Sequence, residues 1–177
     1  QGYDLIGDRD SRLTINKAAL TVTANNANKV YDATTYAGGN GVSFSGFVGG
    51  ETASVLGGAV TYSGTSQGAK NAGKYVIDAG GLSSGNYDIT YQKGDLTIGK
   101  ANLTLQATTD TRTYDGTTNS AKQVIVTGLM GNDALANLSQ SFDSRNAGSR
   151  DLLVDAGYVV NDGNGGGNYN VVVNKAS

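Results

Sequence analysis

The chain has 177 residues, 27 of them Gly, and it contains no Cys, His, Pro or Trp. These absences exclude a disulfide framework, thiol or histidine catalysis, and zinc sites built from Cys or His. The formal charge is −2, from 13 basic and 15 acidic residues, and the basic residues form no cluster of the kind that binds nucleic acid. No stretch approaches the length of a membrane span, so we expect no membrane insertion.

The first residues resemble the end of a unit that recurs later in the chain. Residues 13–18 (LTINKA) match residues 96–101 (LTIGKA) at an offset of 83. Residues 17–22 (KAALTV) continue the match with residues 100–105 (KANLTL). Their alternation of apolar and polar residues predicts strands with one buried face.

Further matches follow in the same order along both halves of the chain. Residues 31–35 (YDATT) match 114–118 (YDGTT), residues 70–73 (KNAG) match 145–148 (RNAG), and residues 86–89 (NYDI) match 168–171 (NYNV). Self-similarity at a nearly constant offset indicates tandem repeats. We therefore expect the end of a preceding repeat or linker at 1–16, repeats at 17–99 and 100–174, and the start of a next repeat at 175–177.

Each unit combines short alternating segments with glycine-rich turns and has little helical character. A helical turn is predicted only at residues 50–56 and their counterpart 131–138, where Thr52 or Asp133 could act as a cap. This pattern indicates an all-β chain of two small immunoglobulin-like β-sandwich repeats. A β-grasp-like sheet with one short helix per repeat is the alternative. In the sandwich we expect each repeat to fold around its own core, with Tyr31, Tyr87 and their counterparts Tyr114 and Tyr169 packed inside.

Together these motifs resemble the mostly-bacterial Ig-like (MBG) and YDG-type repeats. The resemblance rests on the Lys-Ala-x-Leu-Thr lead-in, the Tyr-Asp motif, the Asn-Ala-Gly motif and the closing Asn-Tyr motif, and it covers nearly the whole chain. Ala33 departs from it, because the motif has Gly at this position. Such repeats occur in large bacterial surface adhesins and in filamentous-haemagglutinin-like exoproteins that are exported by two-partner secretion.

The Tyr-Asp pairs are the first candidates for a site. Tyr31-Asp32 and Tyr114-Asp115 could contact a ligand, because an aromatic ring beside a carboxylate suits a sugar. In the alternative interpretation the rings pack on the sheet and the aspartates form Asx-type turns with the following threonines. Recurrence in both units favours this structural role, and the same holds for Tyr87 and Tyr169.

Residues 162–168 (DGNGGGN) place oxygen side chains at alternate positions, as calcium loops do. Asp162 and Asn164 are therefore weak calcium candidates. No Glu follows, however, and the matching stretch of the first unit lacks the acid, so we expect a turn and no cofactor or metal.

No pair of carboxylates or nucleophile in a supporting context is evident, so we expect no enzyme. The resemblance implies stalk or spacer repeats of a secreted or surface-anchored bacterial adhesin, which project an adhesive domain for cell or biofilm attachment. Neighbouring repeats are then the expected partners, and other domains could bind glycan or host surfaces. The alternative is an adhesin module that itself binds glycan or a host protein.

Overall fold

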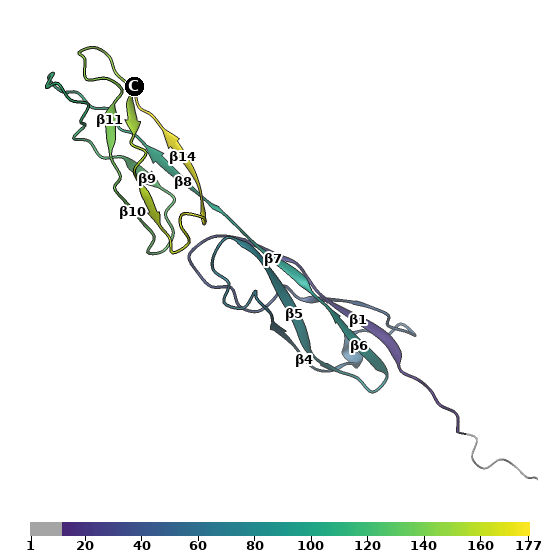
Figure 1. Cartoon of the computed structure of the whole chain (residues 1–177). Helices are drawn as coiled ribbons and strands as arrows, with labels where there is room; N and C mark the ends of the chain where they lie inside the picture. The colour runs from purple at the N-terminus through teal and green to yellow at the C-terminus, as the bar shows by residue number, and fades with distance from the viewer. Residues whose placement is uncertain (1–11) are drawn as a thin grey trace, which may run out of the picture.

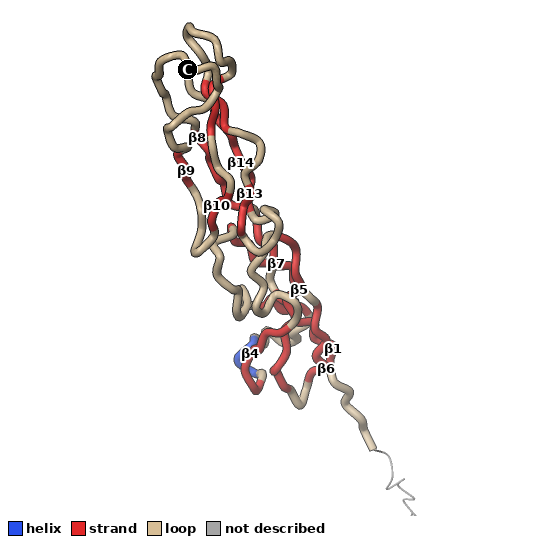
Figure 2. The backbone as a smooth tube through the Cα atoms, turned by 60° about the vertical axis from the view of Figure 1, so that its left-hand side comes forward, coloured by secondary structure: helices blue, strands red, loops and turns tan. Residues whose placement is uncertain are grey.

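The computed structural model describes residues 12–177, which form an elongated molecule of two groups of strands arranged end to end (Figure 1). Of the expected preceding segment 1–16, residues 1–11 lie outside the described part. β7 (Gly94–Gly99) of the first group runs into β8 (Ala101–Gln106) of the second, with only Lys100 between them. Figure 2 shows the same extended shape from a second direction. The chain is all-β, as predicted from the sequence.

The first repeat contains two sheets. One has the strand order β3-β1-β6 and the other the order β2-β7-β5-β4. The strands other than β7 are β1 (Ala18–Ala24), β2 (Ala27–Val30), β3 (Val42–Ser45), β4 (Gly57–Ser63), β5 (Gly73–Ser83) and β6 (Tyr87–Gln92). The predicted alternation holds in β1 and β7, where Leu20, Val22, Leu96 and Ile98 are buried and the residues between them are not.

The predicted helical turn exists only in the first repeat. A single turn of 3-10 helix, η1 (Ala53–Val55), begins after Thr52, whose hydroxyl accepts a hydrogen bond from the Ser54 N–H. The matching segment of the second repeat forms β10 (Ala134–Ala136) instead. The expectation of a turn capped by Asp133 is therefore wrong, because this segment pairs with another strand.

The second repeat is built from shorter strands. Its sheets have the orders β14-β8-β9, β10-β13 and β11-β12. The strands not yet given are β9 (Ile125–Thr127), β11 (Gln140–Phe142), β12 (Leu152–Val154), β13 (Val159–Asn161) and β14 (Tyr169–Asn174).

The strand register corrects the expectation that residues 175–177 start a next repeat. β6 lies parallel to β1 with Tyr87 opposite Ala18, and β14 lies parallel to β8 with Tyr169 opposite Ala101. β14 is therefore the counterpart of β6. After it, Ala176 pairs with Leu152, just as Gly94 at the start of β7 pairs with Ile77. Residues 175–177 thus correspond to the start of β7, the last strand of a repeat.

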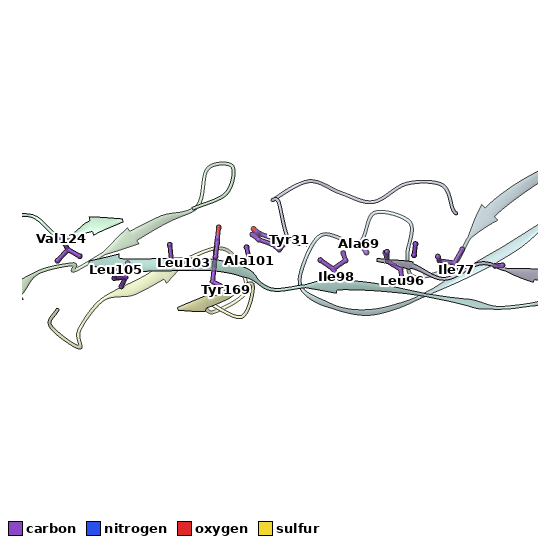
Figure 3. Close-up of a cluster of buried hydrophobic side chains, with 12 residues drawn as sticks. Tyr31, Ala69, Ile77, Leu96, Ile98, Ala101, Leu103, Leu105, Val124 and Tyr169 are labelled. Carbon is purple, nitrogen blue, oxygen red and sulfur yellow. The ribbon is translucent and has the colours of Figure 1, made fainter. Parts of the chain in front are cut away.

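The buried side chains do not form one separate core in each repeat. A smaller cluster around Leu20, Val22 and Tyr87 lies within the first repeat. The larger cluster runs from Ile77 through Tyr31 into the second repeat (Figure 3). The expectation of a separate core for each repeat is therefore wrong, since the two repeats share buried apolar surface where they meet.

Candidate functional site: the joint between the repeats

The joint between the repeats is centred on Tyr31, which follows β2 of the first repeat. Its side chain is completely buried, and its ring meets the Tyr169 ring edge to face at a centroid distance of 5.4 Å. The Tyr31 hydroxyl donates a 2.8 Å hydrogen bond to Oδ2 of Asp133. The Tyr169 hydroxyl donates to the same oxygen and accepts the Met130 N–H at 2.9 Å. One carboxylate therefore holds a tyrosine from each repeat.

A second set of contacts connects the Asn-Ala-Gly motif of the first repeat to the second. Asn168 is fully buried, and its Oδ1 accepts the Ala72 N–H at 2.8 Å. Its Nδ2 donates to Oδ1 of Asn71 at 3.1 Å. Burial of an amide without partners would be costly, so these bonds make Asn168 specific for this neighbour.

Asp162 supports Asn168 from within the second repeat. Its Oδ1 accepts the N–H groups of Asn164 and Gly166, both at 2.8 Å, and its Oδ2 accepts the Asn168 N–H at 3.1 Å. Burial raises the pKa of Asp162, but these backbone donors outweigh burial, so the net shift is downward. Both carboxylate oxygens of the calcium candidate Asp162 thus fix the loop 162–168, and the other candidate, Asn164, donates its Nδ2 to Oδ1 of Asn168 at 3.0 Å.

The Tyr-Asp motif forms the predicted turn in both repeats. Asp32 accepts the backbone N–H and hydroxyl of Thr34 at 2.9 and 2.6 Å and pairs with Lys29 at 3.0 Å. The hydrogen bonds from Thr34 and Lys29 lower the pKa of Asp32 to about 2. Asp115 accepts the same two groups of Thr117, both at 2.9 Å. The aspartates therefore shape the backbone that carries the tyrosines.

The two tyrosines of this motif differ sharply in environment. Tyr31 is enclosed by the joint and is not open to a ligand, whereas Tyr114 is 63% exposed. The expectation that Tyr114 packs in a core is wrong. Its position in the second repeat is the one at which Tyr31 meets a further repeat, and no described residue covers it there.

The first repeat carries the same acceptor arrangement as the second. Its counterparts of Asp133 and Tyr169 are Glu51 and Tyr87, and the Tyr87 hydroxyl donates to Oε2 of Glu51. This hydroxyl also accepts the Val48 N–H at 3.0 Å. Glu51, Asn86 and Tyr87 line a pocket of about 240 Å³, which we call the N-terminal pocket.

Burial and charge set the ionisation of the joint tyrosines. Burial, then the hydrogen bond to Asp133, raises the pKa of Tyr169 to about 12. The same two causes raise the pKa of Tyr31 well above its ordinary value of 10.0. Both hydroxyls therefore remain protonated donors at neutral pH.

Sequence reasoning did not assign roles to Asp133, Asn71 and Asn168 at the joint. Asn71 and Asn168 belong to motifs that recur in both repeats, and an acid occurs at the same place in both loops, as Glu51 and Asp133. This recurrence was the signal from which a role for these residues could have been predicted. A single sequence does not show, however, that a motif of one repeat contacts a motif of the next.

Among residues 12–177, no three His, Cys, Asp or Glu side chains are grouped as a metal site would require. The same part of the chain contains no helix long and apolar enough to cross a membrane. Fold and joint together define a tandem array of all-β structural repeats.

Comparison with protein families identifies these repeats. Residues 20–97 match the MBG domain (YGX type) and residues 99–177 match the YDG domain. The first repeat thus belongs to the MBG family and the second to the YDG family. Both are families of structural, non-enzymatic repeat domains that are typical of large bacterial surface proteins. No curated protein and no solved structure matched the chain.

Proposed function

We propose that this chain is a stiff segment of the stalk of a secreted or surface-anchored bacterial adhesin. The observation that carries the proposal is the joint, where one buried tyrosine and one buried asparagine bind across the boundary between repeats. A stalk must resist bending, and bending here would expose Tyr31 and break its bond to Asp133. The cost of exposing buried aromatic surface opposes such bending.

The covalent connection supports the same function. β7 and β8 belong to different repeats and are separated by Lys100 alone, so the connection leaves little freedom to the backbone. Load that enters the second repeat through β8 passes directly into β7 at the centre of the first. Partners other than adjoining repeats are then bound elsewhere in the adhesin.

Small-angle X-ray scattering on the whole chain tests the stiffness. We expect one elongated particle with a sharply defined maximum dimension. Tyr31→Ala should broaden the distribution of dimensions, whereas Tyr114→Ala, the matched change outside the joint, should leave it unchanged. A broad distribution for the unmodified chain would refute a stiff stalk. Protease treatment of intact bacteria tests the location, and we expect the adhesin to be cleaved. Cleavage that occurs only after the cells are lysed would contradict a surface location.

A further inference from the structure

Two segments of the first repeat that are distant in sequence lie side by side along its length. β1 pairs with β6 and β2 pairs with β7, both in parallel, and the register is the same in the two pairs. Residues 18–30 therefore follow residues 87–99 as one continuous pair, in which each segment crosses from one sheet to the other. Figure 1 shows β1 beside β6, and β7 leading on towards the second repeat. We call these two segments the parallel pair.

The parallel pair is held together at the point where it crosses between the sheets. Residues 25–26 separate β1 from β2, and Lys93 alone separates β6 from β7. A Cβ at Gly94 would lie 2.5 Å from the carbonyl oxygen of Ala24, so only glycine lets the two backbones approach this closely. Oδ1 of Asn26 accepts the Asp95 N–H at 2.8 Å. This side-chain bond connects the segments where the ladder of backbone bonds is interrupted.

Backbone hydrogen bonds extend the parallel pair to both ends of the repeat. At one end the Ala18 N–H donates to the carbonyl oxygen of Asn86 at 3.0 Å, and at the other the Tyr31 N–H donates to that of Gly99 at 2.8 Å. The apolar side chains of the pair that face the interior are buried, namely Leu20, Val22, Leu96 and Ile98. One side of the ladder is therefore closed to water, which would otherwise compete for its hydrogen bonds.

The chain enters and leaves the parallel pair at opposite ends. Lys17 leads into residues 18–30 at one end, whereas residues 87–99 continue through Lys100 into β8 at the other. Tension along the chain therefore pulls the two segments past each other lengthwise. The hydrogen bonds run across the pair, so they carry this load together. A sideways pull at one end would instead break them one after another.

We propose that the parallel pair is the mechanical clamp of the first repeat and transmits tension between residues 17 and 100 by shear. The inference deepens the proposed stalk function and rests on it, because a stalk is loaded along its axis when the adhesive domain that it carries is bound. Lys100 passes the tension into β8, which lies parallel to β14 in the same manner. The pair determines the rate at which the first repeat unfolds under tension.

Force spectroscopy with two pulling directions tests the clamp. The chain contains no Cys, so introduced thiols are unique attachment points in the whole chain. Lys17→Cys with Lys100→Cys places them at opposite ends of the parallel pair. Lys17→Cys with Gly85→Cys places them at the same end, and a Cβ at Gly85 would contact nothing within 4 Å.

At the same constant force, we expect unfolding to be at least about a hundredfold slower when the attachment points are at opposite ends, because several hydrogen bonds then break together. Equal rates in the two directions, or faster unfolding in the lengthwise direction, would overturn the proposal.

A matched pair of substitutions tests the bond at the crossing. Asn26→Ala removes the acceptor of the Asp95 N–H, whereas Asn28→Ala changes an exposed side chain of the same segment. With the lengthwise attachment, Asn26→Ala should unfold about tenfold faster than the parent under the same force, and Asn28→Ala should unfold at the parent's rate. With both attachments at one end, Asn26→Ala should have little effect, since opening begins away from the crossing. An effect of Asn26→Ala that is the same in both directions would exclude Asn26 from the clamp.

The clamp and the stiff stalk can fail separately. Both attachment points lie within residues 17–100, so the second repeat carries no load in these measurements. A clamp that fails under force leaves the scattering test of the joint unaffected. A flexible joint in the scattering test would likewise leave the dependence of unfolding on pulling direction unchanged.

Discussion

Tyr31 and Tyr114 show how far one motif depends on its surroundings. Both follow a basic residue by two positions and precede an aspartate that forms the same turn. Tyr31 is buried because a second repeat covers it, whereas no described residue covers Tyr114 in the same way. The motif therefore forms the same turn in both repeats, and the neighbouring repeat decides whether the ring is buried.

The two tyrosines should consequently differ in their contribution to stability. Tyr31→Ala should lower the free energy of unfolding by about 3–5 kcal/mol, because a buried aromatic ring and its hydrogen bond are lost. Tyr114→Ala should change it by less than about 0.5 kcal/mol. Urea denaturation followed by circular dichroism measures both, and equal losses would contradict the assignment of Tyr31 to the joint.

Asp162 should also contribute strongly, because its carboxylate satisfies three backbone donors of one loop. Asp162→Ala should cost about 2–4 kcal/mol, as bonds to a charged group are lost and buried donors lose their partners. Asp88→Ala, at an exposed position, is the control and should have little effect.

Because the pKa of Asp162 is lowered by folding, its contribution is present above pH 3.8 and is lost as the pH falls below it. As the pH falls below 3.8, the free energy of unfolding should therefore decrease less in Asp162→Asn than in the unmodified chain. Chemical denaturation at a series of acid pH values measures the difference.

At the scale of the elements, the loops that precede η1 and β10 have equivalent sequences and different surroundings. Gly49 and Gly131 are counterparts in these loops, and both have a left-handed backbone, with φ of 63° and 56°. A Cβ at Gly131 would lie 2.7 Å from the Ala33 methyl group across the joint, whereas a Cβ at Gly49 would contact nothing within 4 Å. The second loop is therefore part of the joint.

This difference provides a matched test of the packing between elements. Gly49→Ala and Gly131→Ala should each cost about 1 kcal/mol for the left-handed backbone. Gly131→Ala should cost at least about 1 kcal/mol more, because its methyl group collides with Ala33. Thermal denaturation of both variants gives the difference. Equal destabilisation would show that the loop does not pack tightly against the first repeat.

Ala33 illustrates how the same elements accommodate a departure from the motif. It occupies a left-handed position, φ 64°, where Gly116 of the second repeat has φ 78°. The backbone angle that the motif requires is therefore kept without glycine. The methyl group packs against the shared core, which offsets part of the strain of that angle.

At the scale of the whole molecule, the two repeats are joined by buried surface and by polar groups with raised pKa values. Folding raises the pKa of Tyr169 to about 12 and that of Tyr31 still further from 10.0. In the unfolded chain both tyrosines ionise near their ordinary value. Their contribution to stability is therefore fully present below pH 10 and is lost as the pH rises towards 12.

Alkaline denaturation should reveal this dependence. The free energy of unfolding should fall by at least about 1 kcal/mol between pH 9 and pH 11.5. Tyr31→Phe should make the fall smaller, since one of the two shifted groups is removed. Chemical denaturation at a series of pH values measures the slope, and an unchanged slope in Tyr31→Phe would contradict the role of its hydroxyl.

The sequence by itself determined the class of fold and the existence of repeats. Alternation in β1 and β7 decided which residues face the core, since side chains in a strand point to opposite faces in turn. The turn at Asp32 was also predictable, because it depends on residues close in sequence. The family followed from the order of these motifs.

Only the tertiary structure decided what the motifs contact. Tyr31, Asn71, Asp133 and Asn168 are distant in sequence, and they meet because β7 continues into β8 and places the end of one repeat against the next. The same reason explains the incorrect assignment of residues 175–177. β7 is followed by Lys100 and β14 by Lys175, so these two strands look alike in sequence. Only their partners in the sheet show that β14 is the counterpart of β6 and not of β7. Local patterns fix strands and turns, whereas contacts between repeats depend on register and on how successive repeats are joined.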